Sequence, residues 1–275
     1  MLDLLKTDLK RALKDKLFLV LCIIAGAFAI FTPLLYKGLF TLLEIDAASM
    51  QELEMLGLGI NAKSMFFQSF SLGNNFGLIL PIFVAIILCK DFGHGTIRNK
   101  IICGKSRGCI FLSLFLTAAI LLCGFIFAHA TLTLLISLLF FNYQAAGFGA
   151  GDFGYLMASI GFELLVYLLV TALLVFFIVQ MKNAGLAIVM YFVVSFGMII
   201  VGSITQTMAM FVEPTAVSYD ILRFFNTANA FATTAIGNGT SYALKDVLSL
   251  LLPNAALATL LAFLGYAAFK KKDIK

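Results

Sequence analysis

Long apolar runs separated by short polar segments dominate this chain. The run from Leu17 to Tyr36 carries no charge and is long enough for an α-helix to cross about 30 Å of hydrocarbon, at about 1.5 Å per residue. Five more long apolar runs follow, at 71–89, 109–141, 155–181, 183–211 and 247–269, and the one at 155–181 contains a single acid, Glu163. We therefore predict an all-α integral membrane protein with six transmembrane helices, forming a single domain over residues 1–275.

Polar residues determine where the long apolar runs are divided into spans. The second uncharged window covers 64–89, but Gln68, Asn74 and Asn75 make its first half polar. We therefore place its spanning part at 71–89, with a kink at Pro81. The turn at 182–185 separates the fourth and fifth spans as a tight hairpin. The segment 205–246 is too polar and interrupted to form a clean span.

Basic residues indicate the orientation. Segments 1–16 and 90–108, Lys182 and the tail 270–275 together hold fifteen of the 19 lysines and arginines. With six spans, all of these lie on one side of the membrane. The positive-inside rule then predicts that both termini face the cytosol.

The first sixteen residues combine charges with apolar positions at helical spacing, namely Leu2, Leu5, Leu9, Ala12 and Leu13. We expect residues 1–16 to form an amphipathic helix in the membrane interface. We expect no cleavable signal peptide, because this segment is charged throughout and the apolar run after it is too long.

Composition agrees with a membrane protein: 62% of the residues are hydrophobic and 12% are charged. The five cysteines contain no CxxC pair and there are two histidines, so neither disulfides nor a metal site is expected. Gly104-Lys105-Ser106 matches the end of a Walker A motif, but Asn99 stands where that motif needs glycine. No catalytic motif is present, and neither an enzyme nor a nucleic-acid partner is indicated.

The most basic internal segment is the loop 90–108, "KDFGHGTIRNKIICGKSRG". Its glycines give a flexible exit from the second span, and Thr96 is expected to cap a short helix that starts at Ile97. Ile97 and Ile101 would form an apolar face beside basic residues, and Gly104 would end the helix. A short amphipathic helix of this kind suits docking on another protein, although the loop could also serve only to orient the spans.

This loop resembles that of the type-2 ABC transporter permeases, bacterial membrane subunits with six spans and cytosolic termini. Their pattern is an acidic residue, then Gly-Thr-hydrophobic-basic, then Ser-Arg before the third span. It is matched here by Asp91, by Gly95-Thr96-Ile97-Arg98 and by Ser106-Arg107, with Gly104 where proline is common.

The resemblance implies a coupling helix that contacts a separate ATP-binding subunit. The implied contact residues are Asp91, Gly95, Thr96, Ile97, Arg98, Asn99, Lys100, Ile101, Ser106 and Arg107. It also implies two copies of that subunit, which would bind ATP and Mg, a second permease chain, the same or similar, and short outer helices before the last span. The expected function is export of a hydrophobic or amphipathic peptide, drug or lipid across the bacterial cytoplasmic membrane.

Four polar residues are candidates for a translocation path. Glu163 is the only acid placed inside a span, and His129 is the only acidic or basic residue of the third span. The two could meet on adjacent helices, to contact a substrate or as a buried polar pair. Asn74 and Asn75 lie between Gly73 and Gly77, a GxxxG pattern typical of close helix packing.

Two other classes of function stay open. A secondary transporter independent of ATP would need ligands for a coupling ion, and only Glu163 could serve. A membrane scaffold or sensor subunit would need nothing beyond the docking loop.

Overall fold

The computed structural model describes residues 1–44, 61–73, 75–143, 147–213, 215–231 and 244–272. All regular secondary structure in these ranges is helical. Six helices are long and apolar enough to cross a membrane: α2 (Lys16–Leu42), α5 (Asn75–Gly93), α7 (Arg107–Ser137), α8 (Ala150–Met181), α9 (Ala184–Met210) and α11 (Leu244–Lys271). The predicted all-α fold with six spans is confirmed, and the chain is a multi-pass membrane protein.

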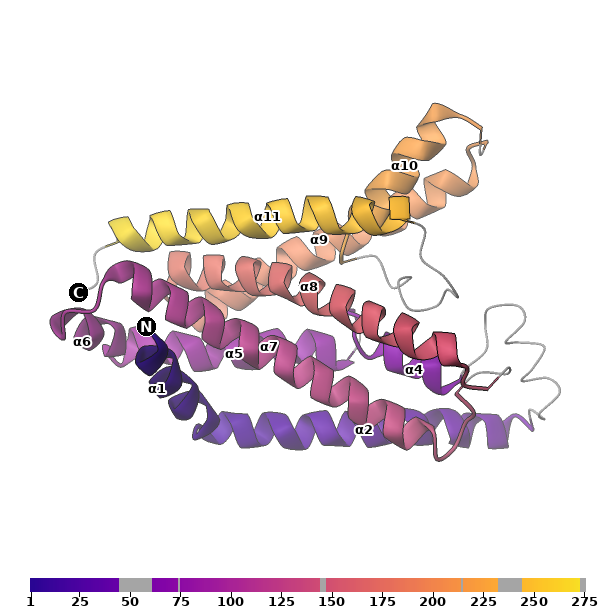
Figure 1. Cartoon of the computed structure of the whole chain (residues 1–275), viewed down its shortest axis with the longest axis horizontal. Coiled ribbons are helices and arrows are strands. Elements are labelled where there is room, and N and C mark those ends of the chain that lie inside the picture. Colours follow the sequence, from indigo (N-terminus) through magenta and orange to yellow (C-terminus); the bar gives the residue numbers. More distant parts are fainter. Residues whose placement is uncertain (45–60, 74, 144–146, 214, 232–243, 273–275) are drawn as a thin grey trace.

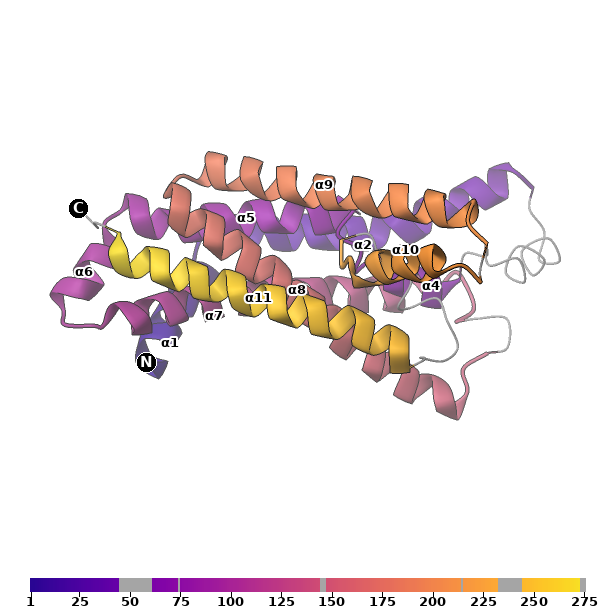
Figure 2. The ribbon, with the colours of Figure 1, turned by 90° about the horizontal axis from the view of Figure 1, so that it is seen from above.

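The six long helices run along one axis of the molecule, and both chain ends lie at the same end of the bundle (Figure 1). We call this the terminal end, and the opposite one the far end. The short helices α1 (Leu2–Leu13) and α6 (Thr96–Ile102) lie at the terminal end. Towards the far end lie α4 (Ala62–Gln68) and α10 (Val217–Ala228), as Figure 2 also shows.

The core of the bundle is built around α7 and α8. α8 packs against α5, α7, α9 and α11, while α7 also contacts α1, α2 and α4. Hydroxyl groups inside these helices bond to their own backbone, as where Thr171 donates to the Tyr167 carbonyl at 2.8 Å. Such bonds let serine and threonine lie in an apolar core without an unpaired polar group.

The second span differs from its prediction. Its helix begins at Asn75, whereas 69–73 form turns that separate it from α4, so the predicted start at residue 71 is wrong. α4 has its own capping box, in which Asn61 accepts from Ser64 N–H at 2.8 Å and Ser64 accepts from Asn61 N–H at 3.0 Å. The Tyr167 hydroxyl of α8 donates to the Phe70 carbonyl at 3.0 Å, which satisfies part of this non-helical backbone.

The GxxxG pattern allows close packing within this chain. Gly73 lies in the turn, and a Cβ on Gly77 would lie 2.3 Å from the Ser71 carbonyl oxygen. Gly77 therefore lets α5 start directly against the preceding turn.

Gly77→Ala is expected to destabilise the protein by about 2 kcal/mol, because the backbone at Ser71 must move to admit the methyl group. Gly124→Ala in α7 is the control, since its Cβ meets nothing within 4 Å and alanine favours a helix. Thermal unfolding in detergent measures both. Equal midpoints for the two variants would contradict the close approach.

Most other boundaries lie close to their predictions. Lys182 adopts a left-handed conformation with φ 53°, and the Asn183 side chain accepts from the N–H groups of Gly185 and Leu186 to cap α9. The predicted hairpin of the fourth and fifth spans is thereby confirmed. α7 ends at Ser137, four residues before the predicted end of the third span at 141.

The polar segment before the last span contains α10, which confirms a short helix there. Asn229, just after α10, donates to the Met198 carbonyl of α9 at 2.6 Å, and Asn254 of α11 donates to the Ala228 carbonyl at 2.9 Å. Met198 lies twelve residues before the end of α9, or about 18 Å along it. α10 therefore runs back along α9, with the Asn229 amide joining its end to α9 and the Asn254 amide bonding to its last carbonyl.

Candidate functional site

The loop between the second and third spans folds as a short helix between two glycine turns. α6 follows Gly95, which has φ 68°, and ends before Gly104, which has φ 77°. Thr96 is the first helical residue and not the cap, so that prediction is wrong. The ending is as predicted: Gly104 N–H donates to the Ile101 carbonyl at 2.9 Å, and Lys105 N–H to that of Lys100 at 3.1 Å.

The two faces of α6 differ from the prediction. Ile97 is 1% exposed and packs into the core of the protein, with Ile101 half-buried beside it. Ile102 is 71% exposed, and Arg98 and Asn99 are exposed with it. The predicted apolar face of Ile97 and Ile101 thus holds α6 to its own chain. The surface open to a partner consists of Arg98, Asn99 and Ile102.

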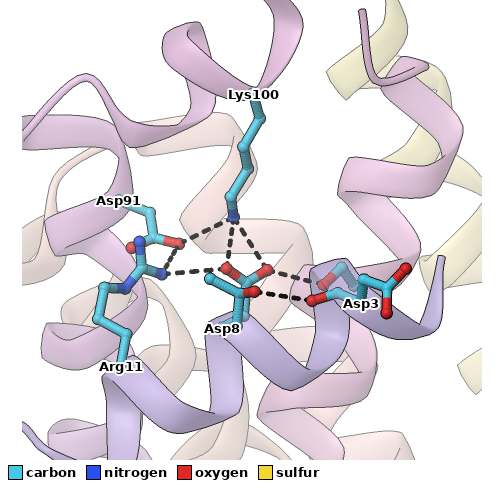
Figure 3. A network of polar contacts seen from close by, with 7 residues as sticks. Asp3, Asp8, Arg11, Asp91 and Lys100 are labelled. Atoms are coloured by element: carbon cyan, nitrogen blue, oxygen red, sulfur yellow. Dashed lines mark hydrogen bonds and ion pairs between the residues drawn. The ribbon is translucent and has the colours of Figure 1, made fainter. Parts of the chain in front are cut away.

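An ion-pair network joins α6 to three other helices (Figure 3). Lys100 Nζ lies 2.7 Å from Asp8 Oδ1 of α1 and 3.6 Å from Asp91 Oδ2, near the end of α5. Arg11 of α1 pairs with the same two carboxylates. Ser113 of α7 donates to Asp8 Oδ2 at 2.7 Å. Both carboxylates are 3% exposed, so two buried acids are matched by two cations.

This balance of charges makes the network a strong constraint on how these helices are arranged. A buried ion pair adds little net stability, but removal of one partner leaves an uncompensated charge and is costly. Asp8, Asp91 and Lys100 therefore hold α1, α5 and α6 in one arrangement. Asp91 and Lys100, predicted to touch a partner, are instead used inside the chain.

A second ion pair lies at the same end. Lys90 Nζ contacts Asp15 Oδ2 at 2.6 Å, and Leu17 N–H donates to Asp15 Oδ1 at 3.0 Å at the start of α2. Burial raises the pKa of Asp15, but the hydrogen bonds from Lys90 and Leu17 outweigh it and hold that pKa below its usual range. α1, α2 and α5 are thus tied together around the turn at 14–15.

The end of the loop is fixed to the last span. Ser106 caps α7 by accepting from Cys109 N–H at 3.3 Å. Arg107 donates to the Lys270 carbonyl at 2.6 Å and to that of Lys272 at 3.1 Å. The Lys272 ammonium in turn donates to the Val179 carbonyl at 2.7 Å, near the end of α8. A displacement of α6 would therefore act on α1, α5, α7, α8 and α11 together.

The candidate path residues do not form one site. His129 Nδ1 donates to the Ala25 carbonyl at 3.1 Å, and its ring lies 4.4 Å from that of Phe76. It lines a cavity of about 100 Å³ among α2, α4, α5 and α7. Glu163 lines a different, smaller cavity on the other side of α4. No bond joins the two side chains, Asn74 lies outside the described residues, and Asn75 is described only as the start of α5.

Comparison with known proteins gives a family without an assigned activity. The sequence pattern of the family "Protein of unknown function (DUF2705)" matches residues 19–275. The chain belongs to the DUF2705 family. No curated protein and no solved structure matches it.

Sequence reasoning missed two residues of the network in this DUF2705 protein, Asp8 and Arg11. Asp8 interrupts the apolar positions of the first helix, between Leu5 and Leu9, and that was the available signal. A charge on the apolar face of an amphipathic helix needs a buried partner. Its main partner, Lys100, is 92 residues away in the sequence, so only the fold could identify it.

Proposed function

We propose that this protein is the membrane-spanning subunit of an ATP-driven exporter of the ABC type, located in the bacterial cytoplasmic membrane. The observation that carries the proposal is α6: a short helix between the second and third spans, joined by buried ion pairs to α1 and α5 and through Asp8 to α7, that still presents Arg98, Asn99 and Ile102 outward. A rigid element with one free face suits force transfer from a partner.

The terminal end is assigned to the cytosol. Fifteen of the 19 lysines and arginines belong to segments on that side, in agreement with the positive-inside rule. Both termini and α6 are then cytosolic. In this orientation, an ATP-binding subunit would be able to reach the exposed face of α6.

The energy source would be a separate chain. The sequence contains no complete nucleotide-binding motif, so ATP and Mg would be bound by two copies of a partner ATPase. A second permease chain, the same or similar, would complete the path. The apolar character of the bundle favours hydrophobic or amphipathic substrates, such as an antimicrobial peptide, a drug or a lipid.

Co-purification tests the proposal. The permease is co-expressed with any ATP-binding chain whose gene lies beside its own, and the purified proteins are placed in nanodiscs. ATP hydrolysis is then measured with and without the permease. We expect a stable complex whose hydrolysis responds to the permease by at least about threefold, roughly 0.7 kcal/mol of coupling. Failure to associate with any such ATPase would overturn the proposal in favour of a secondary transporter or a scaffold subunit.

A further inference from the structure

Glu163 differs from the buried acids of the terminal end in having no partner. It lies thirteen residues into α8, or about 20 Å from the far end of that helix, and is 7% exposed. Among the residues that the structure describes, none makes a hydrogen bond or ion pair with its carboxylate. Asp8 and Asp91, equally buried, each have two cations.

The carboxylate faces a cavity of about 10 Å³, which is the space of a single water-sized particle. Glu163 and Val166 form one wall. Other walls are formed by the turn before α5, through Ser71 and Leu72, and by the segment after α10, through Ala230 and Phe231. Two non-helical segments thus meet at this acid. Irregular backbone deep in a membrane bundle brings carbonyl oxygens towards such a cavity, where they can serve as ligands.

The described groups around Glu163 supply no compensating charge. Its titratable neighbours are Tyr167 on its own helix, with Cys123 of α7 and Tyr191 of α9 beyond it. The Lys63 ammonium lies over the Tyr155 ring at 4.9 Å, and Tyr155 is eight residues, or about 12 Å, further out along α8. An isolated carboxylate in such surroundings is very costly unless a cation neutralises it.

We propose that Glu163 and the adjoining turns form a binding site for one small monovalent cation, a sodium ion or a proton. The size of the cavity excludes hydrated ions and organic cations. The carboxylate supplies the charge, and the Ser71 hydroxyl and the carbonyls of the turns supply neutral oxygens. The site is independent of any ATP-binding partner, so its test and that of the proposed function can fail separately.

Cation-dependent stability tests the site in the purified chain. A fluorogenic thiol reagent reports thermal unfolding, because unfolding exposes cysteines such as the buried Cys89. Sodium is varied against choline at constant ionic strength in one series, and pH is varied without sodium in the other. A cation that binds only the folded state raises the midpoint by about 3 °C for each tenfold increase once the site is filling.

Three variants give the comparison. Glu163→Gln keeps the shape, removes the charge, and should fold at least as stably as the wild type without sodium. Asp152→Asn changes another acid of the same helix and should respond as the wild type does. Glu163→Asp keeps the charge but shortens the side chain, so it should need more cation for the same shift.

Each outcome is decisive. A sodium response that is lost in Glu163→Gln, shifted to higher sodium in Glu163→Asp and kept in Asp152→Asn identifies a sodium site. A response to pH alone, with the midpoint rising as pH falls in the wild type but not in Glu163→Gln, identifies a proton site. A wild type that responds to neither, or a Glu163→Gln variant that responds like the wild type, overturns the proposal.

Discussion

Lys100→Met is expected to destabilise the folded protein by about 3 kcal/mol and lower its thermal midpoint by roughly 6–12 °C. Lys100 contacts both Asp8 and Asp91, as Arg11 does, and its side chain is 11% exposed, against 43% for Arg11. Without it, the two buried carboxylates share Arg11 alone. Thermal unfolding of the purified chain in detergent measures the change.

Lys105→Met provides the matched control for this prediction. Lys105 is exposed at the other side of Gly104, and its side chain belongs to no described ion pair. Its loss should change the midpoint little. The double variant Asp8→Asn/Lys100→Met should be less damaged than the two single changes added together, because both charges of the pair are gone. A Lys100→Met variant as stable as Lys105→Met would contradict the network.

The spans could be predicted from the sequence because the membrane imposes one rule on all of them. Each must hide its backbone polar groups in a helix about twenty residues long, so uncharged runs of that length locate α2, α7, α8 and α9 well. The second span was misplaced at its start for a related reason. Residues 69–73 are apolar enough to extend the span, but Tyr167 and Gly77 let the chain turn there.

The position of the loop helix could also be predicted, but not which of its faces points outward. Ile97 and Ile101 lie on one side and Ile102 on another, so the sequence alone offers two apolar faces. The buried charges decide between them. Lys100 must reach Asp8 and Asp91, and this rotates α6 so that Ile97 enters the core and Ile102 leaves it.

The candidate path residues show a similar limit. The sequence shows that Glu163 and His129 are unusual inside spans, since few such groups are tolerated there. It does not show that α4 lies between them, because a seven-residue helix gives no span signal. Their separation into two cavities depends on how that short helix packs against α7 and α8.

Ile102→Glu is expected to reduce the coupling between the permease and ATP hydrolysis in its proposed partner at least tenfold, while leaving the fold intact. Ile102 is 71% exposed, so a charge there is well solvated in the free chain but would be buried in a contact with the ATP-binding subunit. Arg98 lies one turn earlier on the same face, and Arg98→Glu should weaken the same contact by reversing its charge. Both effects are measured first as the change in ATP hydrolysis that the permease causes in the co-purified complex. Transport is measured next.

Leu139→Glu serves as the control, because Leu139 is similarly exposed, at 78%, but comes two residues after α7, which ends at the far end of the bundle (Figure 1). It should keep full coupling and an unchanged thermal midpoint. If Ile102→Glu and Arg98→Glu also kept coupling, α6 would not be the contact, and the rigid connection of α6 to α1, α5, α7 and α11 would have to serve another purpose. If both lost coupling while their midpoints matched that of Leu139→Glu, the loss would belong to the interface, because the network that holds α6 in place contains neither residue.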